Sequence, residues 1–152
     1  MAIVRTAGTE IIRSALFEDI DASTTDLIIG VQHHIYTVLS ITIYAHAMNA
    51  TTDTCNFYIQ GYDSKGGTTA QNIIICKASV GAVGSTFVWN DKFSFNGYEP
   101  VDFTGPTDDA TKQDAIADQA NTGNVAQKLR ADASHADDSF EVTITYIDQN
   151  NA

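Results

Sequence analysis

The chain has few of the residues that cross-link or stiffen a small protein. Its 152 residues include two cysteines, two prolines and one tryptophan. Two cysteines are too few for a disulfide framework or a four-ligand zinc site. Cys55 and Cys76 both lie in apolar, strand-like runs, and a reducing compartment favours buried thiols, so we predict no disulfide. Apolar packing must therefore supply the core, and a chain of this length can do so.

Positive charge is also scarce. Eight Lys and Arg residues stand against 19 Asp and Glu residues, and the formal net charge is −11. Such a chain repels phosphate backbones and anionic lipid at long range. We therefore do not expect nucleic acid or a membrane surface as a partner.

Long hydrophobic runs are absent. No segment approaches the roughly 18 apolar residues that a membrane-spanning helix needs. The N-terminal stretch "MAIVRTAGTEII" has no apolar core of the kind found in secretory signals, because Arg5 and Arg13 interrupt it. We expect synthesis in a cytoplasm, without export through a signal peptide.

Familiar catalytic and metal-binding motifs are missing as well. The chain contains no G-x-S-x-G, no G-x-x-x-x-G-K-[ST] and no H-E-x-x-H. His33 and His34 are adjacent in a strand-like run, so their side chains should point to opposite faces and could not readily share a metal. Residues 19–26, "DIDASTTD", resemble the start of a calcium loop but lack its glycine, and Gly30 replaces its glutamate; turn or capping roles are favoured.

We therefore expect no enzyme, no cofactor, no metal site and no small-molecule substrate. Nucleophilic catalysis needs a serine or cysteine beside a histidine that an acid orients, and the sequence offers no such pair.

Strand patterning is what the sequence does contain. Residues 38–45 alternate along a long β-branched and aromatic run, 27–48, which Gly30 is placed to break. Two β-rich runs flank the turn "DSKGGTT" and predict a hairpin, and residues 139–149 alternate cleanly as a last strand. Seven or eight strands with polar turns and no helical alternation predict an all-β fold, a β-sandwich or jelly roll.

The stretch "VWNDKFSFNGYEP", residues 88–100, holds the only tryptophan. Trp89, Phe93 and Phe95 share one parity and are predicted core residues, provided that the chain bends at residues 90–92. Asn96-Gly97 then has the composition of a type I′ turn. The alternative is a sugar-stacking platform built from Trp89 and Tyr98, but large aromatic residues more often belong to cores.

Composition changes after residue 104. Residues 104–138 are rich in Ala, Asp and Gln, and they predict a partly helical surface insertion over about 107–137. One helix would run from Asp108 to about Asn121, and a shorter helix from Val125 to Ala133. The large apolar side chains here, which we expect at a subunit or capsid contact, are Ile116, Val125 and Leu129. The predicted organisation is a single domain over 1–152, with an N-terminal arm at 1–10, this insertion, and the last strand at 139–149.

Three segments resemble small β-sandwich virion proteins of tailed bacteriophages. They are the hairpin "NFYIQGYDSKGG…IIICKASV", the strand "STFVWNDKFSFNG" and the closing "YIDQ". The resemblance covers roughly residues 11–103 and 139–149, whereas the shorter members pass almost directly into the last strand without a counterpart of 104–138.

The resemblance implies a non-enzymatic structural protein of the virion. Such a protein would be a capsid decoration (cement) protein, or a head or tail accessory protein, made in the host cytoplasm and bound to the outer capsid surface. Its partner would be the major capsid protein or another virion protein, and a homotrimer is expected. The alternative function is a receptor- or carbohydrate-binding β-sandwich module of a tail fibre or adhesin.

Overall fold

The computed structural model describes residues 9–63, 65–100 and 125–150, and this part of the chain is all-β, with no helix. Nine strands follow one another: β1 (Thr9–Ile20), β2 (Thr25–Ile29), β3 (His34–Ala47), β4 (Thr54–Asp63), β5 (Thr68–Ser79), β6 (Thr86–Trp89), β7 (Phe93–Asn96), β8 (Lys128–Ala133) and β9 (Ser139–Asn150).

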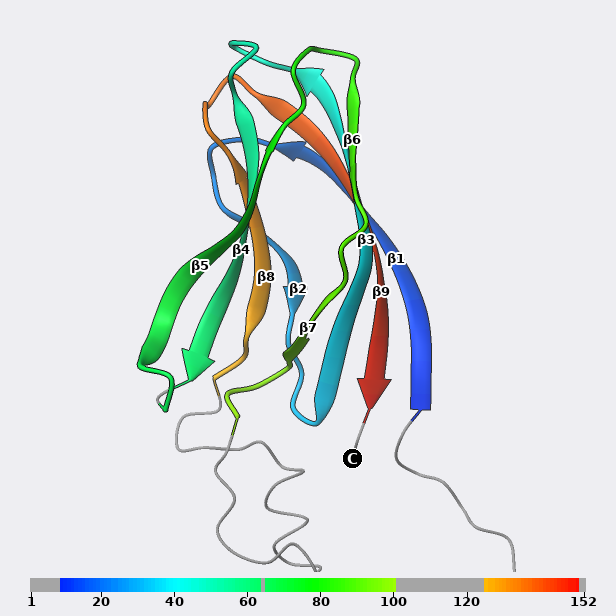
Figure 1. Ribbon diagram of the computed structural model, residues 1–152, viewed down its shortest axis with the longest axis vertical. Coiled ribbons are helices and arrows are strands. Elements are labelled where there is room, and N and C mark those ends of the chain that lie inside the picture. The colour runs from blue at the N-terminus through cyan, green and yellow to red at the C-terminus, as the bar shows by residue number, and fades with distance from the viewer. Residues whose placement is uncertain (1–8, 64, 101–124, 151–152) are drawn as a thin grey trace, which may run out of the picture.

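The strands form two antiparallel sheets, which lie side by side as two layers (Figure 1). Sheet A has the order β1-β9-β3-β6, and β7 also pairs with β3; sheet B has the order β2-β8-β4-β5. Two facing sheets of this kind are consistent with the predicted β-sandwich.

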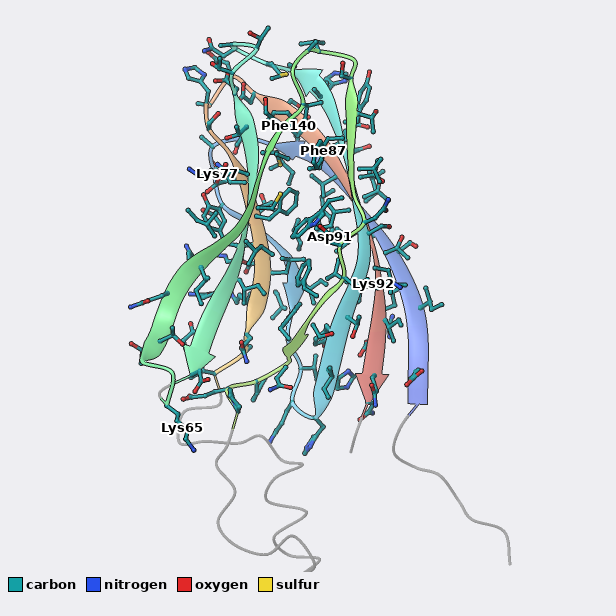
Figure 2. All side chains as sticks on the ribbon, in the orientation of Figure 1. Lys65, Lys77, Phe87, Asp91, Lys92 and Phe140 are labelled. Carbon is teal, nitrogen blue, oxygen red and sulfur yellow. The ribbon has the colours of Figure 1, made fainter. Side chains whose placement is uncertain are left out.

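The core forms because alternate residues of each strand face the opposite sheet. In β9 the inward residues Phe140, Val142 and Ile144 are fully buried, while Thr143 between them is exposed. Figure 2 shows Phe140 between the two layers. From sheet B, Phe57 and Leu129 are buried in the same core. The predicted parity of the last strand is therefore confirmed.

Several other predicted elements are confirmed. Strand β2 ends at Ile29 and β3 begins at His34, so the long apolar run is interrupted at Gly30. The hairpin β4–β5 forms around the Gly-Gly turn. The two cysteines are not opposite each other in it, because Cys55 pairs with Ala78 and Cys76 pairs with Phe57. Residues 90–92 separate β6 from β7, as the bend required.

The helix predicted over residues 125–133 is wrong. Residues 128–133 form β8, which lies between β2 and β4 in sheet B. Leu129, Ala131 and Ala133 alternate inward, and the small alanines suit the narrow space between the sheets. Packing between two neighbours here outweighs the weak strand propensity of Ala and Lys. The end of the predicted insertion is thus part of the sandwich, while the first helix, over 108–121, lies outside the described residues.

The type I′ turn predicted at Asn96-Gly97 is also wrong. That turn needs positive φ at both central residues, and neither residue has it. Gly97 is required by crowding instead, because a Cβ atom there would lie 1.9 Å from the carbonyl oxygen of Val31. Its amide donates to the carbonyl of His34 at 2.7 Å, and its own carbonyl accepts from the amide of Gln127 at 2.9 Å. This glycine therefore joins three segments.

Candidate functional site

Two of the three predicted contact residues, Val125 and Leu129, lie in the described part of the chain. Leu129 is 0% exposed and lies in the core, so its predicted role in a subunit or capsid contact is wrong. Val125 is half-buried beside the isolated bridge between Tyr98 and Ala126. Ile116 lies outside the described residues. Among the described residues, a contact surface must therefore be sought outside Val125 and Leu129.

Trp89 faces the interior, as the core interpretation predicted. Its ring stacks on Phe93 at 5.2 Å between centroids and contacts Phe57 at 6.4 Å. Phe95 is buried, whereas Phe87 remains 37% exposed because β6 lies at the edge of the sheet. Tyr98 is half-buried and belongs to a different segment. The two aromatic residues of the predicted sugar platform are therefore not presented together on an open face.

Much of the outer face of sheet A, across its five strands, carries no charge. Its residues alternate with buried ones, so their side chains point away from sheet B. We call this set the uncharged face: Ile12, Ser14, Leu16, Thr37, Ser40, Thr42, Val88, Ser94, Thr143, Thr145 and Ile147. Glu10, Glu18 and Glu141 border it, and the exposed Asp91 and Lys92 lie at its edge, in the segment that joins β6 to β7. In a chain of net charge −11, such a region is unusual.

Hydroxyl groups on the uncharged face bond to each other across strands. The hydroxyls of Ser14 and Thr145 lie 3.3 Å apart, and those of Thr37 and Ser94 lie 2.9 Å apart. Strands about 4.8 Å apart and runs of about five residues make the face on the order of 300 Å² in plan. A standard protein interface buries about 800 Å² per partner, so one such face supports only a weak contact.

The outer face of sheet B is different because it is charged and internally paired. Asp26 accepts hydrogen bonds from Lys128 at 2.8 Å and from Arg130 at 2.6 Å. Burial alone would raise the pKa of Asp26, but these bonds and the two positive charges outweigh it and lower that pKa. Asp132 accepts from the hydroxyl of Tyr58 at 2.9 Å. These charges hold β2, β8 and β4 together.

A hollow of about 280 Å³ lies on the inner side of sheet A, at the end where β1 and β3 begin and β9 finishes. It is lined by Ile11, Arg13, His34, Asp148 and Asn150. Asp148 accepts from Arg13 Nε at 3.0 Å through one oxygen and pairs with His34 Nδ1 at 2.5 Å through the other. Three neighbouring strands thus place a carboxylate between two basic side chains.

Two ionisable groups of the interior are kept neutral. Burial, with a further contribution from the charge of Asp148, raises the pKa of Tyr36 to about 12. Burial also raises the pKa of the Cys55 thiol to about 12. Neither group suits a nucleophile near neutral pH, because both stay protonated there. Both cysteines are free.

Sequence reasoning did not single out the hollow, although one signal pointed towards it. Asp148 shares the inward parity of Phe140, Val142 and Ile144, and a carboxylate on a buried face needs partners. The identity of those partners depends on the register of β1 and β3 against β9, which no local pattern specifies.

The stretch 19–26 makes the predicted turn. The Asp21 carboxylate accepts from the amide of Ser23 at 2.7 Å, and the Asp19 carboxylate accepts from the hydroxyl of Ser139 at 2.9 Å. Over residues 9–63, 65–100 and 125–150, no three His, Cys, Asp or Glu side chains gather as a metal site. Within the same ranges, no helix is long and apolar enough to cross a membrane.

Comparison with known proteins gives no relative: no protein-family model matches the chain, and no curated protein matches it. The geometry of the described residues is therefore what bears on function.

Proposed function

We propose that this chain is a structural protein of a phage virion, which decorates the capsid and docks on it through the uncharged face. The supporting observation is the face itself, eleven uncharged residues on five strands in a chain of net charge −11. Charged residues are depleted from the centres of protein interfaces, because each charge must lose its water there. The charged face of sheet B lacks this property.

The strand order supports the finer fold assignment, a jelly roll. Both β6 and β7 pair with β3, so they act as two halves of one strand. The pairs β1·β9, β2·β8, β3·β6/β7 and β4·β5 are then nested, as in a long antiparallel ribbon that is wrapped into two sheets. Jelly rolls occur in viral capsid proteins and in lectins. Because a fold alone does not assign a function, the uncharged face carries the proposal.

A weak contact suffices for decoration if it is repeated. A homotrimer would present three copies of the face, and linked contacts raise the overall affinity far above that of one contact. We propose a non-enzymatic role with this arrangement, in which the hydroxyl and methyl groups of the face serve for packing. Binding to sugar through Trp89 gains no support, because that ring stacks inside the sandwich.

The test is binding of the purified chain to capsid particles from the genome that encodes it. Thr143→Arg would place a cation among Leu16, Thr42 and Thr145 at the centre of the face, and we expect capsid binding to fall at least tenfold. Thr69→Arg, an exposed site on β5 in the other sheet, is the matched control and should bind like the natural chain.

Light scattering on the same samples should give three times the chain mass of 16.4 kDa for the natural chain. Equal capsid binding by Thr143→Arg and by the control would show that the face is not the contact. A genome without virion genes would refute the function itself.

A further inference from the structure

Arg13, His34 and Asp148 come from three strands and meet at one end of sheet A. Arg13 lies early in β1, His34 is the first residue of β3, and Asp148 lies near the end of β9 (Figure 1). In the register, Tyr36 is opposite Asp148 on one side and Ile11 is opposite it on the other, so Arg13 and His34 are its diagonal neighbours. Long side chains can reach across such diagonals.

Asp148 orients both basic groups. Its side chain is 11% exposed, and each of its oxygens faces one partner. A carboxylate only accepts hydrogen bonds, so the proton of the short contact belongs to His34 Nδ1. The same ring therefore turns its other nitrogen, Nε2, away from Asp148.

The triad leaves more donors than Asp148 uses. Among the described residues, Arg13 bonds only through Nε, so neither terminal Nη nitrogen has a partner. Nε2 of His34 has none there either. The side chains of Arg13 and His34 are 49% and 21% exposed, and both line the hollow.

We propose that this hollow is a binding site for a small oxyanion, a carboxylate or phosphate group. The two terminal nitrogens of Arg13 form a planar fork that matches two oxygens of such a group. Nε2 of protonated His34 donates to the anion from the side, and Asp148 holds both donors in place. The volume of about 280 Å³ lies just below the roughly 300–1,000 Å³ of pockets that hold drug-sized ligands, so the hollow has room for a small anion.

Protonation of His34 should strengthen the site. With neutral His34, the charges of Arg13 and Asp148 cancel; with protonated His34, the triad has one net positive charge. The ionisable groups around His34 are Arg13 on β1, Tyr36 on β3, Tyr146 and Asp148 on β9, and the preceding His33. Both tyrosines have raised pKa values and stay neutral in acid. The pH dependence of binding therefore reports on the charge of His34.

The experiment is calorimetric titration of the full chain with inorganic phosphate and, separately, with acetate, at constant ionic strength and over a series of pH values. The stronger of the two ligands identifies the preferred group. Arg13→Gln should weaken binding at least tenfold, because a hydrogen bond to a charged group contributes about 1.5–3 kcal/mol. Arg13→Lys keeps the positive charge but lacks the planar fork, so its affinity for the anion should lie between those of Arg13→Gln and the natural chain.

Arg130→Gln is the matched control on the charged face of sheet B and should bind within about twofold of the natural chain. His34→Gln should remove the contribution of His34 to any pH dependence of binding while leaving some binding to Arg13. If Arg13→Gln does not fold, Arg13→Lys and His34→Gln still test whether the triad binds an anion. Absence of millimolar binding to either anion, or equal binding by Arg13→Lys, His34→Gln and the natural chain, would reduce the triad to a structural ion pair. Neither result affects the uncharged face, which lies on the other side of sheet A.

Discussion

Truncation of Leu129 gives the sharpest test of the architecture. Leu129 is 0% exposed on β8, between its cross-strand neighbours Ile28 and Ile59. Leu129→Ala removes three carbon atoms from this site and leaves a cavity, because neighbours on two strands cannot close around it. Substitutions of this kind cost about 2–5 kcal/mol, and we expect about 3 kcal/mol.

The control is the same substitution on the opposite surface. Leu16 is 57% exposed on the uncharged face, so Leu16→Ala should cost under about 1 kcal/mol. At about 2–4 °C per kcal/mol for a domain of this size, the unfolding temperature should fall by roughly 6–12 °C for Leu129→Ala and only slightly for Leu16→Ala.

Urea and thermal unfolding, followed by circular dichroism and by the fluorescence of Trp89, measure both variants. Capsid binding below the unfolding temperature should show the reverse order, weakened by Leu16→Ala and unchanged by Leu129→Ala. If Leu129→Ala unfolds like the natural chain but loses association, β8 does not belong to the core and the helical interpretation of residues 125–133 is restored.

Two further predictions concern Gly97 and Tyr36. Gly97→Ala should destabilise the fold by about 1–3 kcal/mol or more, because its Cβ would overlap the carbonyl of Val31, whereas Gly66→Ala in the β4–β5 turn should change the urea midpoint little; equal midpoints would contradict the close approach. Burial and Asp148 raise the pKa of Tyr36 from 10.0 to about 12, so its contribution to stability is complete below pH 10 and is lost as the pH rises through 12. Tyr36→Phe should flatten the stability profile over that range, and ultraviolet titration of the natural chain should show one tyrosine ionising late; a profile that the variant leaves unchanged would refute this.

The strands that could be predicted are those whose local pattern agrees with their final position. In β9 the alternation of Phe140, Val142 and Ile144 with polar residues is visible in the sequence, and the sheet buries that same face. The hairpin around the Gly-Gly turn was equally clear, since its partners are close in sequence. Local information suffices where the partner is nearby or the alternation is strong.

Strand β8 could not be predicted for the opposite reason. Residues 128–133 combine Lys, Leu, Arg, Ala and Asp, which favour a helix when taken alone. Only the sandwich provides the two neighbours, β2 and β4, that make a strand favourable there. Gly97 shows the same limit. The dipeptide Asn96-Gly97 indicates a turn, whereas the structure requires glycine there because the backbone of Val31 approaches so closely.

By itself, the sequence determined the all-β class, the parity of the main strands, the inward position of Trp89 and the acidic charge, because all four follow from composition and from neighbours along the chain. The tertiary structure alone decided which charged side chains pair and which sheet face lacks charged side chains. Arg13, His34 and Asp148 gather because β1 and β3 both pair with β9 in one register. The uncharged face exists because β1, β9, β3 and the pair β6 and β7 present their hydroxyl and methyl groups side by side, and no local pattern sets that order.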